Sequence, residues 1–497
     1  MNGYLLGSSL GRKGMPVDRL RGVYTAVVLL VALNLAIVDG QSPQLRDALC
    51  AAAELPVLPD PLPTADGYRG IWYCNQPQKD EYAYKYSGGL GLYCVKHRPF
   101  AVYSPEAHKT FFCYGGTDAE GKTLLHMVSY YDHATKTFPR PRILLDKKTD
   151  DAHDNPVLQI DPQGYIWIFS ASHGTARPSY ISVSKKPYSI EAFHCVAVTN
   201  FSYPQPHWVP GEGFLFLHTR YASGHRRLFQ ATSADGRRWS EPQMLAYIEM
   251  GHYQISQQCG KRVCTALNFH PKPVGLNART NLYYMETDDF GRTWRNAAGK
   301  VLKLPLEKPD NDALVHDYRA EGLLVYLKDL VFDAQGHPII LYITSKGYES
   351  GPKNDPRTWC TARWTGQSWE IRGSIRSDNN YDAGSLYIEA GGQWKLIAPT
   401  EPGPQPYNTG GEIAVWVSSD QGATWQKLRQ LTSNSQFNHT YVRSPLGAHP
   451  DFYALWADGH GRQRSESRLY FTNRQCQQVW RLPTKMAGQT APPELVQ

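Results

Sequence analysis

Short apolar runs separated by turn residues recur along the chain from about residue 68 to residue 484. Examples are YIWIFSAS at 165–172, GFLFLH at 213–218 and PIILYITS at 338–345. Runs of this length, rich in aromatic and β-branched residues and bounded by Gly, Pro, Asn and Asp, are typical of β-strands. Strong helical periodicity is absent from this part of the sequence. The pattern therefore predicts an all-β body.

A second pattern, Ser/Thr-x-Asp-x-Gly-x-x-Trp, occurs three times. It reads SADGRRW at 233–239, one residue shorter than the others, TDDFGRTW at 287–294 and SSDQGATW at 418–425. This is the Asp-box, a β-hairpin turn in which the Asp and Gly shape the loop and the Trp packs beneath it. Three copies with the Trp in register predict structural hairpins, and we do not assign them to a functional site.

The spacing of the Asp-boxes predicts a propeller. Their aspartates, Asp235, Asp289 and Asp420, lie 54 and 131 residues apart, and a period near fifty in an all-β pattern indicates propeller blades. We predict an all-β, seven-bladed β-propeller with Asp-box hairpins over residues 67–484. Its blades are predicted at 68–146, 151–200, 203–247, 250–305, 315–374, 378–432 and 437–484.

The segments outside the propeller have different compositions. Four basic residues between Arg12 and Arg21 precede the apolar run Val23–Val38, which predicts a signal peptide or uncleaved signal anchor over residues 1–40. A Pro-rich lead-in is expected over 41–66 and a C-terminal tail over 485–497. We therefore expect a secreted or periplasmic protein, or one held at a membrane only by the N-terminal segment.

Charge and cysteine content limit the classes of partner and cofactor that the sequence predicts. The formal charge of +7 is mild and its basic residues are scattered, which suits an anionic polysaccharide and gives no sign of nucleic-acid binding. Nine cysteines leave at least one unpaired within the chain. Cys259 and Cys264 are predicted either to bridge a hairpin or, with His252 and His270, to bind zinc. We otherwise expect no cofactor, with structural zinc or calcium as the alternative, and a monomer.

Candidate chemistry is densest between Asp151 and Tyr221. The first strand of each propeller blade lines the central channel, and the loops that lead into these strands form one open face. Polar residues recur at those positions, so we predict a polar central pocket. The candidates are His153, His173, Tyr203, His207, Arg220, Tyr253, Asp382, His439 and Arg443.

From YRGIW at Tyr68 through YSGGLG, the Asp-boxes, RTWCTARW, EPGPQPYNTGGE and SRLYFTN, the sequence resembles BNR repeat-containing proteins. Among them it is most similar to the seven-bladed propeller polysaccharide lyases, notably ulvan lyases. Those enzymes cleave next to a uronic acid by β-elimination, using two His about twenty residues apart, then a Tyr, then an Arg some sixteen residues later. In this sequence the order and spacing match His153, His173, Tyr203 and Arg220.

The chemistry of β-elimination suits the same residue types. Arg binds a carboxylate through its planar fork and stays charged, so Arg220 is predicted to neutralise the uronate. His titrates near neutral pH, so His153 or His173 is the candidate base. Tyr203 is predicted to protonate the leaving oxygen or to act as the base, and Tyr253 to contact the substrate. His207, Asp382, His439 and Arg443 are predicted to complete the substrate pocket.

Two other functions fit the sequence. A sialidase-like hydrolase would use three arginines around a carboxylate, for which Arg69, Arg220 and Arg443 are available. Another glycoside hydrolase would use two carboxylates from Asp154, Asp329, Asp382 and Glu412. A non-catalytic propeller that binds a glycan would use the same aromatic and basic pocket.

Overall fold

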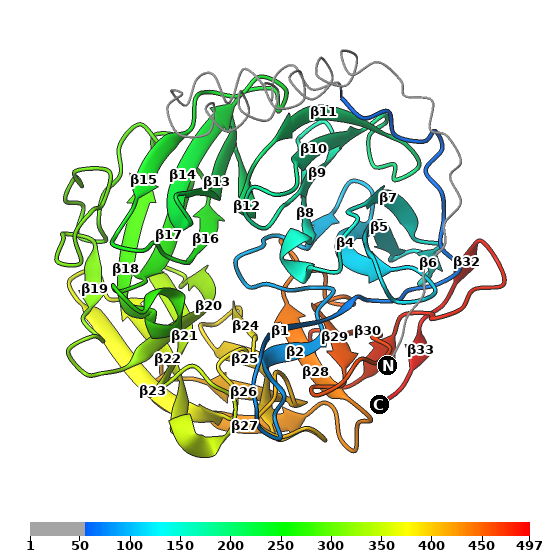
Figure 1. Ribbon diagram of the computed structural model, residues 1–497. Helices are drawn as coiled ribbons and strands as arrows, with labels where there is room; N and C mark the ends of the chain where they lie inside the picture. Colours follow the sequence, from blue (N-terminus) through cyan, green and yellow to red (C-terminus); the bar gives the residue numbers. More distant parts are fainter. Residues whose placement is uncertain (1–54) are drawn as a thin grey trace, which may run out of the picture. The chain divides into compact units, whose positions relative to one another are not determined.

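Residues 55–497 are the part of the chain that the computed structural model describes, and they form a ring of antiparallel sheets (Figure 1). The predicted signal segment, 1–40, lies outside the described residues, as do residues 41–54 of the lead-in. Helical structure within 55–497 is limited to the 3-10 helices η1 (Ala152–Asp154), η2 (Gly275–Ala278) and η3 (Pro352–Asn354). None of the described helices has the length and apolar character needed to span a bilayer.

Seven sheets of at least four strands are the predicted blades. In chain order the first four are β3 (Ala101–Ser104), β4 (Lys109–Thr117), β5 (Leu124–Asp132) and β7 (Arg142–Asp146); β8 (Pro156–Ile160), β9 (Ile166–Ser170), β10 (Ser179–Ser184) and β11 (Phe193–Thr199); β12 (Ser202–Val209), β13 (Gly213–Ala222), β14 (His225–Ser233) and β15 (Gln243–Ala246); β16 (Gln254–Cys259), β17 (Arg262–Phe269), β18 (Thr280–Thr287) and β19 (Leu314–His316).

The other three blades follow the same plan. They are β20 (Leu324–Phe332), β21 (Pro338–Ser345), β22 (Arg357–Trp364) and β23 (Trp369–Ser377); β24 (Ser385–Ile388), β25 (Trp394–Glu401), β26 (Glu412–Ser418) and β27 (Gln426–Gln430); and β28 (Asn438–Arg443), β29 (Ala454–Gly459), β30 (Leu469–Thr472), β31 (Val479–Arg481) and β33 (Glu494–Leu495). The first strands of most neighbouring blades contact one another, and the seven sheets surround a common centre (Figure 1), which confirms the seven-bladed propeller.

The first blade begins later than its predicted start at residue 68. The strand-like runs before residue 101 pair with each other instead, as the two-stranded sheet β1 (Trp72–Pro77) and β2 (Tyr84–Gly89). The chain leading into this hairpin is bound to the last blade by Gly70 N–H to the Ser467 carbonyl at 2.9 Å and to the first blade by Ile71 N–H to the Gly115 carbonyl at 2.9 Å. The hairpin is therefore an addition at the seam between the first and last blades.

Strands near the C-terminus also reach across to other elements. Residues 485–497, predicted as a tail, include β33, which pairs with β31, and β32 (Thr490–Ala491), which pairs with β6 (Phe138–Pro139). Between the first and last blades, Leu446 N–H donates to the Ala101 carbonyl at 2.9 Å and Tyr103 N–H to the Leu446 carbonyl at 3.0 Å. Backbone hydrogen bonds therefore close the ring.

All three Asp-boxes form the predicted turns between the third and outer strands of their blades. In the second, the Asp289 carboxylate accepts hydrogen bonds from the Thr287 hydroxyl and the Thr293 N–H, both at 2.8 Å. Trp294 lies beneath this turn and is 1% exposed. The Asp289 side chain thus provides a hydrogen-bond acceptor for the backbone of a tight loop, as in Asx-turns.

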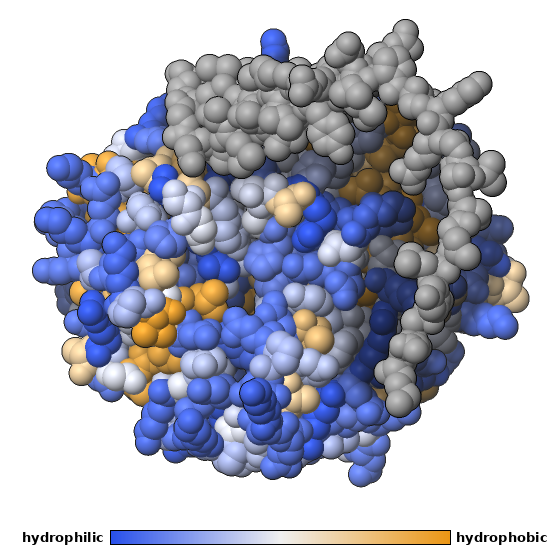
Figure 2. Space-filling model, in the orientation of Figure 1, coloured by the Kyte–Doolittle hydropathy of each residue, from blue (hydrophilic) through white to orange (hydrophobic). Residues whose placement is uncertain are grey.

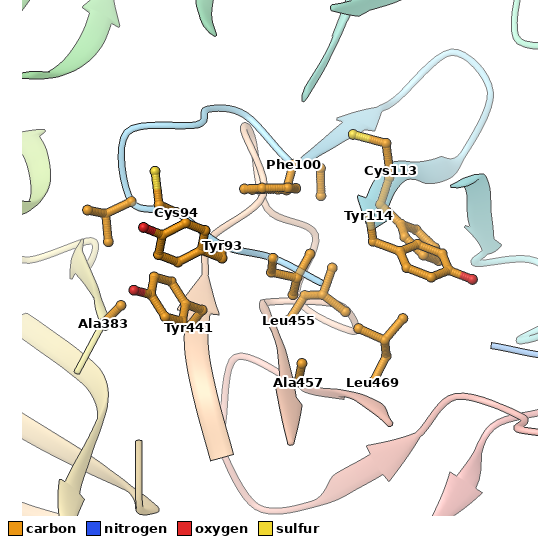
Figure 3. Close-up of a cluster of buried hydrophobic side chains, with 14 of the residues drawn as sticks. Tyr93, Cys94, Phe100, Cys113, Tyr114, Ala383, Tyr441, Leu455, Ala457 and Leu469 are labelled. Carbon is orange, nitrogen blue, oxygen red and sulfur yellow. The ribbon is translucent and has the colours of Figure 1, made fainter. Parts of the chain in front are cut away.

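The seam between the first and last blades is packed with apolar side chains. Tyr114 in β4, Tyr441 in β28 and Leu455 in β29 belong to one buried cluster, to which Tyr93 contributes from the loop after β2 (Figure 3). By contrast, hydrophilic residues make up most of the molecular face in Figure 2. The apolar runs of the sequence thus pack the blades against one another.

Candidate functional site

The short helix η1 positions the predicted histidines at the entry to the inner strand β8. Asp151 caps the helix, because its carboxylate accepts a hydrogen bond from the His153 N–H at 3.0 Å, as N-cap residues do. At the other end of η1, Asp154 accepts hydrogen bonds from the His173 N–H at 2.6 Å and from Arg177 Nε at 2.7 Å. These contacts hold the loop after β9 against η1, so His173 lies beside His153.

One carboxylate joins the two histidines. His153 Nδ1 lies 2.5 Å from Asp151 Oδ1, and His173 Nδ1 lies 2.9 Å from Asp151 Oδ2. The imidazole rings stack with centroids 3.9 Å apart. Burial opposes ionisation of Asp151, but its contacts with the two histidines prevail and lower its pKa. Because an ionised carboxylate only accepts hydrogen bonds, each ring carries its proton on Nδ1, and Nε2 is the acceptor in the neutral form.

The two rings differ in their access to a ligand. His153 is buried, and its Nε2 lies 3.0 Å from the Tyr86 hydroxyl and 2.8 Å from the Tyr93 hydroxyl. Burial and repulsion from His173 lower the pKa of His153 to about 4, so this ring is neutral at physiological pH. The His173 side chain is 25% exposed. His173 is therefore the member of the pair that can reach a bound molecule.

A group of tyrosines with one arginine adjoins the histidine pair. The hydroxyls of Tyr203 in β12 and Tyr221 in β13 are 3.3 Å apart, and the ring of Tyr221 lies 6.0 Å from that of His173. Tyr253 packs edge-on against Tyr203. Across the β13–β14 hairpin from Tyr221, Arg226 places its guanidinium carbon 5.0 Å from the ring centres of both Tyr221 and Tyr253.

The two hydroxyls of this group are held in their protonated form. Burial and the proximity of Tyr221 raise the pKa of Tyr203 well above its ordinary value. Burial also raises the pKa of Tyr221 to about 12, although Arg226 opposes the shift. Both phenols are therefore proton donors at neutral pH.

Three buried cations surround Tyr253. Lys96 Nζ lies 4.6 Å, Arg279 Cζ 4.7 Å and Arg226 Cζ 5.0 Å from the centre of its ring. Burial, with repulsion from Arg279 and Arg226, lowers the pKa of Lys96 to about 7. Arg226 Nε is buried and has no hydrogen-bond partner among residues 55–497. Buried charges are normally paired, so this arrangement suits an anionic ligand.

The predicted arginine, Arg220, lies elsewhere. Side chains alternate across a strand, so Arg220 shares a face of β13 with His218, opposite to Tyr221, and its guanidinium carbon lies 5.9 Å from the Phe229 ring centre. The hairpin register pairs Tyr221 with Arg226. Arg226, and not Arg220, is thus the arginine of this hairpin that lies beside Tyr221 and Tyr253.

Of the predicted substrate contacts, Tyr253 lies in this group. The other four are buried, and each makes a hydrogen bond within or between blades, so we do not assign them to the site. The pairs are His207 with Ser256, Asp382 with the Gly410 N–H, His439 with Trp456, and Arg443 with the His97 carbonyl.

The arginine triad of the sialidase-like alternative is not assembled. Arg69 forms an ion pair with Asp66 at 2.5 Å. Arg443 lies against the Phe100 ring, and Arg220 lies over Phe229. The three arginines therefore have different surroundings.

The predicted zinc ligands and disulfide are also separated. Cys259 is exposed at the turn of the β16–β17 hairpin, where it pairs with Arg262, whereas Cys264 is buried one strand over, and both are free thiols. His252 precedes β16 and His270 follows β17, at the opposite end of the hairpin. The hairpin was predicted from the apparent turn, but its register does not place the two cysteines opposite each other.

A cavity of about 710 Å³ is lined by none of the site residues described above, but side chains link it to them. It is lined by the β1–β2 hairpin and by the loop after β21, residues 348–353. Lys85 lines it, with Nζ 5.1 Å from the Tyr348 ring centre and 5.9 Å from that of Tyr381. Tyr381 stacks on Tyr86 at 4.2 Å, and Tyr86 contacts His153. The cavity is thereby connected to the histidine pair through a row of side chains.

Several residues of the site were not predicted from the sequence. Asp151 could have been found, since it lies two residues before His153 in DDAHD. A Ser-Gly turn at 223–224 could have indicated the β13–β14 register, which pairs Tyr221 with Arg226. The others come from segments far apart in the chain, where no local pattern marks them. These residues are Tyr86, Tyr93, Lys96 and Arg279.

Comparison with known proteins agrees with this architecture. A model of the BNR repeat-containing family matches residues 110–376, which is more than half of the chain. The chain belongs to the BNR repeat-containing family. The resemblance inferred from the Asp-boxes and neighbouring motifs is confirmed.

Two ulvan lyases are among the proteins with similar sequences. The ulvan lyase of Nonlabens ulvanivorans is 24% identical over 433 residues, which cover 77% of this chain and 88% of the relative. That of Alteromonas sp. (strain LOR) is 23% identical, over 67% of this chain and 76% of the relative.

Solved structures show the shared fold. A PL25 ulvan lyase bound to -[GlcA(1-4)Rha3S]- superposes with a TM-score of 0.62 at 17% identity, covering 82% of this chain and 95% of that one. The polysaccharide lyase Uly1 gives a TM-score of 0.57 at 12% identity, with coverage of 84% and 99%.

Proposed function

We propose that the protein is a polysaccharide lyase that cleaves an anionic polysaccharide next to a uronic acid by β-elimination. The observation that carries this proposal is the convergence of the Asp151-bridged histidine pair, the Tyr203–Tyr221 hydroxyl pair and Arg226. The similarity to ulvan lyases over most of the chain supports the same reaction class.

The cations have the first role in the proposed reaction. A proton on C5 of a uronate becomes acidic enough to remove only when the adjacent carboxylate is neutralised. Arg226 offers a buried Nε with no hydrogen-bond partner among the described residues, and Lys96 and Arg279 add positive charge around Tyr253. Donors fixed in a buried site stabilise developing negative charge more strongly than water does.

His173 is the base of this scheme. Asp151 holds its proton on Nδ1, so Nε2 can accept the C5 proton, and the same carboxylate stabilises the imidazolium that forms. His153 has Nε2 in contact with two tyrosine hydroxyls and is assigned a positioning role.

The tyrosine pair completes the elimination. As the C5–H bond breaks, its electrons form the C4=C5 double bond and the C4–O bond breaks. Tyr221, the more exposed member of the pair, donates a proton to the leaving oxygen and is reprotonated through Tyr203. The products are a new sugar end with a hydroxyl group and an unsaturated uronate.

Product analysis tests the reaction class. The chain is incubated with a panel of uronic-acid polysaccharides, and ultraviolet absorbance and reducing ends are followed together. We expect both signals to rise in parallel and His173→Gln to abolish them. Reducing ends without absorbance would indicate a hydrolase, and polymer binding without either signal would indicate the non-catalytic alternative.

A further inference from the structure

Three histidines and an aspartate lie together at the seam between the first and last blades. His108 connects β3 and β4, His133 follows β5, and His449 and Asp451 belong to the loop between β28 and β29. Ligand atoms of His133, His449 and Asp451 lie within 4.8 Å of one another. The ring of His108 lies 5.4 Å from that of His133 and 5.5 Å from that of His449.

His133, a member of this cluster, has an unused ring nitrogen. The residue is 4% exposed, and its Nε2 lies 2.9 Å from the Thr110 hydroxyl. Its Nδ1 is buried and has no hydrogen-bond partner within the described part of the chain, which is uncommon for a buried polar atom. When Nε2 donates to the Thr110 hydroxyl, the Nδ1 lone pair is free to bind a metal ion.

The other side chains can complete a ligand set. His108 Nδ1 lies 3.2 Å from the Tyr103 hydroxyl, which leaves its Nε2 available. His449 Nδ1 accepts a hydrogen bond from the Asp451 N–H at 3.1 Å, and this is the contact with which a metal ion would compete. Asp451 is exposed and adds a carboxylate. Imidazole with carboxylate is a donor set that zinc takes in four-coordinate sites.

We propose that His133, His449 and Asp451, with His108 as the fourth ligand, bind a divalent transition-metal ion such as zinc, which clamps the first blade to the last. His108 and His133 belong to the first blade, whose strands end at Asp146, and His449 and Asp451 to the last, whose strands begin at Asn438. No strand is shared between these two described blades. A bound ion would therefore add a link across a seam that is otherwise joined by backbone hydrogen bonds and apolar packing.

Zinc binding by the full chain tests this proposal. Protein stripped with a chelator is titrated with zinc chloride by calorimetry, and bound metal is counted after desalting. We expect one ion per chain at this site and a rise in Tm with zinc, since a ligand that binds the folded state stabilises it. His449→Gln and Asp451→Asn should each weaken binding about tenfold or more and reduce the rise in Tm.

His460→Gln is the matched control. His460 lies in the same blade, and its Nδ1 likewise accepts a hydrogen bond from the N–H two residues later, at 3.0 Å, so this variant should keep the ion. Zinc held by the Asp151, His153 and His173 group is identified separately by its loss in His173→Gln. Wild-type protein without a zinc site, or zinc binding unchanged in both His449→Gln and Asp451→Asn, would overturn the proposal. Neither result bears on the lyase reaction.

Discussion

Asp151 determines which nitrogen of each neighbouring histidine carries the proton. Its two oxygens contact His153 Nδ1 and His173 Nδ1, so one carboxylate orients both rings. Asp154 also helps to position His173, because its carboxylate accepts a hydrogen bond from the His173 N–H. The proton-accepting atom of the proposed base is thus set by a neighbouring carboxylate.

Replacement of Asp151 by Asn tests this role. An amide retains only one acceptor oxygen and adds a donor, so one histidine loses its partner. We expect Asp151→Asn to lower kcat by about 10²-fold or more and to change KM little. Asp150→Asn, at the exposed neighbouring position, should keep wild-type kcat. Equal kcat values for the two variants would contradict the role of Asp151.

Lys96 makes the binding of an anionic polymer depend on pH. Its pKa of about 7 means that the ammonium charge is present below that pH and is lost above it. A bound carboxylate favours the charged form, so binding takes up a proton and affinity falls as pH rises above about 7. Calorimetry with the inactive His173→Gln variant between pH 6 and 9 measures this effect, and adding Lys96→Met should flatten it. The same slope with and without Lys96 would exclude this lysine as its source.

At the scale of elements, the β13–β14 hairpin selects the site arginine. Ala222 pairs with His225, so Tyr221 faces Arg226, and Arg220 faces Arg227. In the sequence, Arg220 is favoured by its spacing from Tyr203. Such spacing carries no information on which face of a strand a side chain occupies, so it could not show that Arg226, and not Arg220, lies beside Tyr221. A one-residue shift in the turn would reverse the two faces.

The Asp-box hairpins contribute to stability according to the burial of their tryptophans. Trp294 is 1% exposed, whereas Trp425, at the same motif position, is only partly buried. We expect Trp294→Ala to cost about 3–5 kcal/mol of unfolding free energy and Trp425→Ala clearly less, as measured by denaturant unfolding. kcat should remain near wild type for both under conditions where they are folded. A larger cost at Trp425 would show that motif position, not burial, determines the effect.

At the scale of the whole molecule, the ring is joined by segments that the sequence did not mark as structural. The repeat period and the Asp-boxes predicted seven blades because each blade is a local unit of consecutive strands. The seam depends on contacts between residues hundreds of positions apart, such as Gly70 with Ser467, which leave no periodic signal. For the same reason Lys96 was not identified as a residue of the site.

Removal of residues 488–497 tests the contribution of the C-terminal strands. The truncation exposes the edges of β6 and β31 by removing β32 and β33. We expect a lower Tm in a thermal unfolding scan, with activity retained at temperatures where the protein stays folded. Glu494→Gln, which removes the ion pair with Arg481 but keeps the strand, should cost much less. An unchanged Tm after truncation would show that these pairings do not stabilise the ring.

The most direct test of the proposed lyase site compares Arg226→Ala with Arg227→Ala by the rate of ultraviolet-absorbing product formation from a uronic-acid polysaccharide. Arg226 faces Tyr221 and Tyr253, whereas its neighbour Arg227 lies over Tyr247 on the other face of the strand. We predict that kcat/KM falls by about 10²-fold or more in Arg226→Ala, as when a preorganised charge donor is lost, and stays near wild type in Arg227→Ala. Full activity in Arg226→Ala, with activity lost in Arg220→Ala instead, would contradict the site described here.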